Sequence, residues 1–168
     1  MKMENMIKLL HELVKNSKRS DRYLAKTLQI SQPTITRTRK RLEKMGYIQE
    51  YTVIPNMTKL GFEIAAFTFL NIARYDIKTG EKNREIAEKA HEWIKTNPRI
   101  MFAAGGDGLN GKNCMMVSLH RDFTDYTEFI SDFRTRWAAN IKDIDGFLVP
   151  LRGMMPKRFS FKYIEEIK

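Results

Sequence analysis

Residues 31–48, SQPTITRTRKRLEKMGYI, are the stretch around which the rest of the chain is organised. Ser31 suits a helix N-cap because its hydroxyl can accept from a free backbone N–H group, and Pro33 suits the first helical turn. Gly46 suits the end, since glycine adopts the left-handed cap conformation without penalty. Apolar side chains recur at helical spacing on one edge, and hydroxyl and cationic side chains cover the rest. We therefore expect a helix of residues 31–45 whose docked edge carries Ile35, Leu42 and Met45.

Two shorter helical patterns precede this stretch. Residues 3–16 carry apolar side chains on one face, and residues 21–28 form a second amphipathic segment that Ser20 can cap. The turn at residues 29–31 then leads directly into the basic helix, an arrangement that is typical of a helix-turn-helix. Residues 47–55, YIQEYTVIP, alternate apolar and polar side chains, so we expect a strand at the position of a wing.

The second part of the chain is rich in strand patterns. Residues 56–61 form a turn-rich hinge, which predicts domains of residues 1–60 and 61–168. Beyond it we expect strands at 62–73, 99–104, 113–120 and 144–151, helices at 81–97 and 122–140, and a further strand at 158–164. This order predicts an α+β chain, a winged helix-turn-helix followed by a ferredoxin-like βαββαβ domain. Strand 62–73 is apolar on both faces, as expected for a sheet with helices on one side and a partner surface on the other.

The net charge of +10 is concentrated near the N-terminus. Residues 1–60 carry 13 Lys and Arg against 5 Asp and Glu, whereas residues 61–168 carry 17 against 15. This distribution favours a polyanionic partner, most simply nucleic acid. A membrane surface is a weaker alternative because the basic helices are short and capped. No apolar run approaches the roughly 18 residues that span a bilayer, and the N-terminus lacks a signal peptide, so we expect a cytoplasmic protein.

Several motifs suggest chemistry that their context does not support. Residues 106–112, GDGLNGK, match the spacing of a phosphate-binding P-loop, but Asn113 replaces the required Ser or Thr, and a strand pattern follows instead of a helix. A glycine-rich hairpin accounts for the same residues, and such a loop can also bring backbone N–H groups and Asp107 close to a small zwitterionic ligand.

The chain offers no clear catalytic or metal-binding set. His11, His91 and His120 lack metal-ligand spacing, and Cys114 lies in an apolar run where a core role is expected. We therefore predict no metal, no cofactor and no enzymatic activity. The aromatic residues of the second domain are interpreted as core residues, with base stacking in an RNA-binding module as the alternative; they are Phe67, Phe69, Phe102, Phe123, Phe133 and Trp137.

Taken together, the two halves resemble the leucine-responsive regulator (Lrp/AsnC) family of transcription factors along essentially the whole chain. The resemblance is carried by Leu24-Ala25, Ile30-Ser31, Arg41-Leu42-Glu43, Gly46-Tyr47-Ile48, Tyr51 and Lys59-Leu60-Gly61, followed by the βαββαβ half. It implies a homodimer built through the C-terminal sheets, with higher assemblies such as tetramers or octamers.

The resemblance also implies an amino acid or other small effector, bound near the loop that joins the middle strands. In this chain the corresponding residues are Gly105, Gly106, Asp107 and Gly108. The chain departs from the family at Thr38-Arg39, where an arginine and an apolar residue are usual. The sirohaem decarboxylases resemble the same family and supply an enzyme alternative, but their histidine- and arginine-containing motif is not found here.

The predicted partner is double-stranded DNA, read by a dimer with two copies of the basic helix in successive major grooves. Amide, hydroxyl and guanidinium groups in the first turns of the helix suit base edges; these are Gln32, Thr34, Thr36 and Arg37. Cationic side chains farther along this helix and at the start of the preceding one suit phosphates; these are Lys40, Arg41, Lys44, Arg19 and Arg22.

Overall fold

The computed structural model describes residues 3–72 and 81–164, and the chain divides into two units. Unit 1 contains Met1–Ile54 and Pro156–Lys168, and unit 2 contains Pro55–Met155. This division differs from the predicted domains of residues 1–60 and 61–168 in two places. The first boundary lies after Ile54, and Pro156–Lys168 group with unit 1 and not with the sheet. The hinge is a 3-10 turn, η1 (Met57–Leu60), that leads through Gly61 into the sheet of unit 2, and the end of the chain groups with unit 1.

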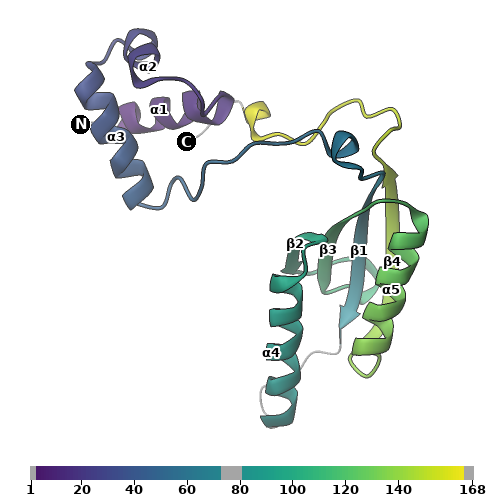
Figure 1. Ribbon diagram of the computed structural model, residues 1–168. Helices are drawn as coiled ribbons and strands as arrows, with labels where there is room; N and C mark the ends of the chain where they lie inside the picture. The colour runs from purple at the N-terminus through teal and green to yellow at the C-terminus, as the bar shows by residue number, and fades with distance from the viewer. Residues whose placement is uncertain (1–2, 73–80, 165–168) are drawn as a thin grey trace. The chain divides into compact units, whose positions relative to one another are not determined.

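Unit 1 is built from three helices, α1 (Met3–Lys15), α2 (Asp21–Leu28) and α3 (Gln32–Lys44) (Figure 1). Their apolar faces enclose one small core in which every side chain is at most 4% exposed. The helix-turn-helix prediction is confirmed, although Met45, expected in the core, is 46% exposed. The core residues are Met6, Leu9, Leu13, Leu24, Ile35 and Leu42.

Two predicted strands are absent from the described part of unit 1. Residues 48–55 belong to no helix or strand, and Val53 is 81% exposed. The alternation at residues 47–55 thus did not produce a strand, because a strand needs a neighbour that accepts its backbone hydrogen bonds. Residues 158–164 contain the 3-10 turn η3 (Phe161–Tyr163), which lies against α1. The Ser160 hydroxyl accepts from the Lys162 N–H and favours this turn over a strand.

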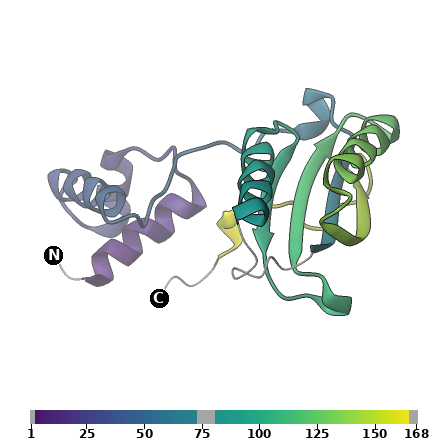
Figure 2. The same ribbon diagram turned by 90° about the horizontal axis from the view of Figure 1, so that it is seen from below.

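Unit 2 contains a four-stranded antiparallel sheet with the strand order β2-β3-β1-β4 (Figure 1). The strands are β1 (Ile64–Ile72), β2 (Ile100–Gly105), β3 (Cys114–His120) and β4 (Ile141–Pro150). Helix α4 (Glu81–Thr96) connects β1 to β2, and α5 (Phe123–Trp137) connects β3 to β4. The predicted ferredoxin-like βαββαβ order is confirmed. Figure 2 shows the chain turning between β2 and β3 at one end of the sheet.

Both helices of unit 2 lie on one face of the sheet. Trp93 of α4 stacks on Phe129 of α5 with ring centroids 6.0 Å apart, and Phe129 lies 5.0 Å from the His120 ring of β3. Ala66, Thr68 and Leu70 of β1 point to this side and are at most 1% exposed. Alternate residues of each strand therefore fill the layer between the sheet and the helices.

The opposite face of the sheet carries a row of apolar side chains. Phe67 of β1 pairs with Val117 on one side and Phe147 on the other, and Val117 in turn pairs with Phe102. Phe102 and Phe147 are 50% and 66% exposed. Core packing was therefore the wrong interpretation for Phe102, and also for Phe123, which is 61% exposed at the start of α5.

The described helices do not include one with the length and apolar character needed to cross a membrane.

Candidate DNA-binding surface

The turn between α2 and α3 is defined by local backbone geometry. The Ser20 hydroxyl accepts from the Tyr23 N–H at 3.2 Å and caps α2, as predicted. Gln29 then adopts a left-handed conformation with φ of 55°, which ends α2 and redirects the chain. Ser31 occupies the N-cap of α3, but its hydroxyl meets the Thr34 hydroxyl at 2.8 Å instead of a backbone N–H. These features fix the start of α3 relative to α2.

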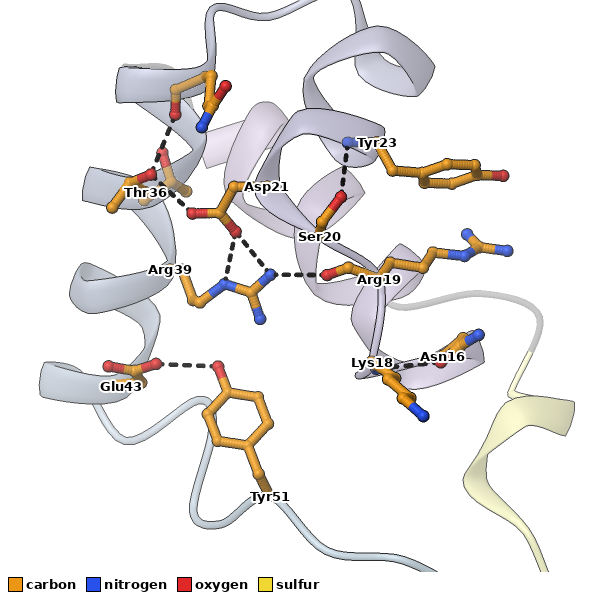
Figure 3. A network of polar contacts seen from close by, with 12 residues as sticks. Asn16, Lys18, Arg19, Ser20, Asp21, Tyr23, Thr36, Arg39, Glu43 and Tyr51 are labelled. Carbon is orange, nitrogen blue, oxygen red and sulfur yellow. Dashed lines mark hydrogen bonds and ion pairs between the residues drawn. The ribbon is translucent and has the colours of Figure 1, made fainter.

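A partly buried ion pair joins the two helices (Figure 3). Arg39 of α3 donates from Nε and Nη2 to Asp21 Oδ1 at 3.0 and 2.7 Å, and its Nη2 also donates to the Arg19 carbonyl at 3.3 Å. The Thr36 hydroxyl donates to Asp21 Oδ2 at 2.6 Å. Burial alone would raise the pKa of Asp21, but the hydrogen bonds from Thr36 and Arg39 and the charge of Arg39 lower it. The carboxylate is therefore ionised at neutral pH and fastens α2 to α3.

The network continues to the segment after α3. The Tyr51 hydroxyl donates to Glu43 Oε1 at 2.9 Å, and the Arg39 guanidinium carbon lies 6.0 Å from the Tyr51 ring centroid (Figure 3). The left-handed Gly46, with φ of 76°, ends α3 and allows the chain to turn back toward it. Tyr51 thereby connects the segment after α3 to Glu43 and lies beside the Arg39 guanidinium.

The outer ridge of α3 consists of Arg37, Lys40, Arg41 and Lys44, which are all exposed. Arg37, Lys40 and Lys44 follow one another at helical spacing, so their side chains leave the helix in one direction. Within residues 3–72 and 81–164, none of the four makes a hydrogen bond or ion pair with its side chain. The ridge therefore presents four uncompensated positive charges to solvent.

The remaining predicted DNA contacts lie in different environments. Gln32 and Arg22 are exposed, and Thr34 is half-buried beside Ser31. Arg19 forms an ion pair with Glu12, and its guanidinium lies 5.1 Å from the Tyr23 ring centroid. Arg19 and Thr36 therefore connect parts of unit 1, Arg19 through Glu12 of α1 and Thr36 through Asp21 of α2.

Sequence reasoning missed the residues that build this support. Arg39 was noted only as a departure from the family pattern, yet it makes the central contacts of the network. Thr38 is 3% exposed and its hydroxyl donates to the Thr34 carbonyl at 2.6 Å. The available signal was the position of Asp21 directly after the Ser20 cap, opposite the basic helix, but no local rule specifies which of several arginines it would pair with.

The candidate effector residues Gly105, Gly106, Asp107 and Gly108 lie at the end of β2 and in the β2–β3 loop. The Gly106 and Gly108 N–H groups donate to the Asn113 and Lys112 carbonyls at 3.0 and 2.7 Å. This hairpin geometry confirms the interpretation of the glycine-rich run as a loop between two strands.

Side chains at both sides hold the β2–β3 loop in place. The Asn113 amide accepts from the Ile72 N–H at 2.9 Å and donates to the Ile72 carbonyl at 2.7 Å. Lys112 forms ion pairs with Asp143 and, at 2.9 Å, with Asp145. Its hydrogen bond with Asp143 is the main cause that raises the pKa of Lys112. The loop is therefore fixed to both β1 and β4.

A cavity of about 460 Å³ lies between the sheet and the helices α4 and α5. Gly105 and Gly106 line it, whereas Asp107 and Gly108 do not. Cys114 also lines the cavity, and burial raises the pKa of its thiol, so the sulfur is protonated at neutral pH. Its apolar walls include Leu70, Ile94, Ala103, Phe133 and Trp137.

Known proteins are similar to this chain over its helix-turn-helix and over most of its length. Residues 4–49 match the family described as winged helix-turn-helix DNA-binding. The HTH-type transcriptional regulator LrpC of Bacillus subtilis is 25% identical over 145 residues, which cover 86% of this chain and 92% of that protein. The regulator LrpA of Pyrococcus horikoshii is 30% identical over 124 residues, covering 74% of this chain and 79% of LrpA.

The solved structures extend the similarity to the whole fold. A transcriptional regulator from Neisseria meningitidis in complex with L-Met matches with a TM-score of 0.77 over 95% of this chain and 94% of that chain, at 14% identity. The winged helix-turn-helix class is thereby confirmed together with the α+β second unit. On its sequence and its fold, the chain belongs to the Lrp/AsnC family of HTH-type, DNA-binding transcription regulators.

Proposed function

We propose that the outer ridge of α3 enters the major groove of duplex DNA and reads its sequence. The observation that carries this proposal is the set of four exposed, unpaired cations on a helix that an ion pair clamps to α2. A rigid helix favours specificity, since base edges are distinguished only by groups held in a fixed register. The long-range attraction of the ridge for phosphates supplies affinity and depends strongly on salt.

The roles of the ridge residues and of their neighbours follow from their positions in the helix-turn-helix. Gln32, Thr34 and Arg37 lie in the first turns of α3, where a recognition helix contacts base edges. Arg37 suits a guanine edge and Gln32 an adenine edge, because each can form paired hydrogen bonds there. Lys40, Arg41, Lys44 and Arg22 are proposed to hold phosphates. Thr36 and Arg19 are left out of this assignment because their side chains are bound within unit 1.

We also propose a homodimer formed through the open face of the sheet in unit 2. The row of Phe102, Val117, Phe67 and Phe147 crosses all four strands, and no described helix covers it. A second copy of the chain is the simplest partner for this face, because a two-fold axis brings the same apolar row of each copy together. The dimer would then bring two copies of α3 to half-sites about one helical turn of DNA, or a multiple of it, apart. Tetramers or octamers would arise by further contacts between dimers.

An amino acid is the proposed effector. The relative from Neisseria meningitidis has been solved in complex with L-Met, and the fold of the two chains agrees. In the present chain the β2–β3 loop with Gly105, Gly106, Asp107 and Gly108 offers exposed backbone and one carboxylate beside a mostly apolar cavity. The proposal is supported by this combination of polar backbone and apolar volume, which suits a zwitterion with an apolar side chain.

Selection of bound sequences from random duplex DNA tests the function directly, performed with and without a mixture of the twenty amino acids. The proposal predicts an enriched sequence with two-fold symmetry, and an enrichment that changes when amino acids are present. Recovery of unenriched DNA in both arms would contradict sequence reading. An enriched motif that is identical in both arms would retain DNA reading and remove the amino-acid effector.

A further inference from the structure

The chain returns to unit 1 after the sheet. Residues 157–163, KRFSFKY, follow β4 and belong to the same unit as the three helices, where η3 lies against α1. We call this stretch the C-terminal arm. It is connected to unit 2 by sequence and to the helix-turn-helix by contact, so it is part of the DNA-binding unit although it comes from the far end of the chain.

The arm alternates cations with exposed aromatic rings. Lys157 and Lys162 place their Nζ atoms 4.4 and 5.1 Å from the ring centroid of Tyr163. Phe159 and Phe161 meet edge to face with centroids 5.3 Å apart, and they are 73% and 61% exposed. Two adjoining exposed phenylalanine rings form an apolar patch, a feature of surfaces that bind a partner.

The cations of the arm are not neutralised by neighbouring acids in the described chain. Lys157, Arg158 and Lys162 have no ion pair with any residue of 3–72 or 81–164. The two lysines rest instead on the face of an aromatic ring, a contact that leaves their charge available to an anion. The arm is therefore positively charged as well as aromatic.

The charge distribution between the units also favours a polyanionic partner for unit 1. The sequence of unit 1 contains 16 Lys and Arg against 7 Asp and Glu, and that of unit 2 contains 14 against 13. Almost the whole net charge of +10 thus belongs to unit 1, and the arm contributes three of its cations. A polyanion that binds the ridge of α3 is attracted by the arm as well.

We propose that the C-terminal arm is a second DNA-contacting element, which binds phosphates outside the sequence read by α3. Its three cations would pair with the backbone, and its exposed rings would pack on sugars or on base edges in the adjoining minor groove. The proposal rests on the proposed function, because it requires that unit 1 binds duplex DNA. A membrane surface is the weaker partner for the arm, since the arm shares its unit with a helix-turn-helix and forms no amphipathic helix of its own.

Charge removal in the full chain tests this proposal. The variant carries K157Q, R158Q and K162Q, and the matched control carries K95Q, R121Q and R134Q, three exposed cations of unit 2. Both lose three positive charges. Affinity is measured between 50 and 300 mM salt for two duplexes, one limited to the selected site and one with about 15 further base pairs on each side.

The proposal predicts a difference between the two duplexes. On the long duplex the arm variant should lose about tenfold or more in affinity at low salt, and the slope of log K against log salt should become shallower by about 2 to 3, since each phosphate contact contributes roughly 0.9. On the short duplex the arm variant and the control should agree. The double variant F159A/F161A should weaken binding to the long duplex while leaving the salt slope near the wild-type value.

Three results would overturn the proposal. Equal salt slopes for the arm variant and the control on the long duplex would remove the arm from the DNA contact while leaving the role of α3 intact. A changed sedimentation coefficient, or lost binding to vesicles of anionic lipid, with an unchanged slope would assign the arm to self-association or to a membrane. Failure of the wild-type chain to bind any duplex would instead remove the proposed function, and this inference with it.

Discussion

At the scale of single residues, Arg39 and Arg37 show how two arginines of one helix take different roles. Arg39 faces α2 and forms two hydrogen bonds with Asp21, while Arg37 is exposed and has no partner among the described residues. The difference arises from their angular positions on α3. A step of two positions along a helix turns the side chain by about 200°, so the two arginines point to nearly opposite sides. One arginine therefore stabilises the unit, and the other is available to a ligand.

Replacing Arg39 by alanine should destabilise unit 1. The change leaves the Asp21 carboxylate partly buried without its main donor, which costs about 1–3 kcal/mol. Chemical denaturation followed by circular dichroism measures the loss, with Arg41→Ala as the control because Arg41 is exposed on the same helix. Equal stabilities of the two variants would show that the ion pair does not hold α2 to α3.

Replacing Arg37 by alanine should reduce specificity more than affinity. Loss of paired hydrogen bonds to a base edge is expected to weaken binding to the selected site by about 1–3 kcal/mol, with a much smaller effect on random duplex. Lys40→Ala provides the comparison, since loss of a phosphate contact should weaken both complexes similarly. Equal losses for Arg37→Ala on the two duplexes would reassign it to the phosphates.

The sequence could predict these residues only in part. Cap positions, the basic edge and the buried Ile35 and Leu42 follow from local rules and are found as expected. The engagement of Thr36 and Arg19 within unit 1 could not be predicted, because it depends on Asp21 of a different helix and Glu12 of another. Pairing across helices is set by tertiary geometry, which a periodicity does not contain.

At the scale of elements, the βαββαβ order was predictable and the extended segment after α3 was misread. Strands β1 and β3 have partners on both sides, so their apolar patterns produced strands. Residues 47–55 have the same alternation, but the described part of unit 1 offers no neighbouring strand, and Tyr51 instead hydrogen-bonds to Glu43 of α3. A strand pattern thus predicts a strand only where a second strand is within reach.

The open face of the sheet carries the prediction at this scale. Phe147→Lys should shift the protein from dimer toward monomer, because a cation placed in an apolar interface is desolvated without a partner. Sedimentation equilibrium measures the change. Phe123→Lys is the matched control, since Phe123 is similarly exposed, at 61% against 66%, but begins α5 instead of lying in the row. A dimer that survives Phe147→Lys unchanged would place the interface elsewhere.

At the scale of the whole molecule, the two units have separate tasks, and their stabilities should respond differently to pH. His120 of unit 2 is fully buried, with Nε2 2.8 Å from the Ser118 hydroxyl and Nδ1 3.7 Å from Asp125. Burial lowers the pKa of His120, the nearby Asp125 opposes this, and Arg99 adds to it. The ring is therefore neutral in the folded protein at neutral pH.

The pH dependence of unit 2 follows from this lowered pKa. Below about pH 6.5 the unfolded chain takes up a proton that the folded chain does not, so the stability should fall as pH decreases from 7 to 5, by at most about 1.4 kcal/mol per pH unit for this one group. His120→Gln should flatten the profile and remove most of the fall in stability between pH 7 and 5. Thermal unfolding at several pH values checks this, and parallel profiles for His120→Gln and wild type would exclude His120 as the cause.

The order of the two units could be predicted from the sequence, but the grouping of the C-terminal arm with unit 1 could not. The concentration of charge near the N-terminus and the family resemblance indicated a DNA-binding unit followed by an assembly unit. The return of residues 157–163 to the first unit was not predictable, because the contact of η3 with α1 joins the two ends of the chain. Such a contact leaves no periodic signal in either segment.

Sequence reading by α3 is tested by the affinity of the wild-type chain for the selected duplex and for a scrambled duplex of the same length and composition, measured at one salt concentration. We expect a preference of about 10³-fold or more for the selected duplex, as is usual for specific regulators. Equal affinities would show that the basic ridge binds only the phosphate backbone and would contradict sequence reading by this helix.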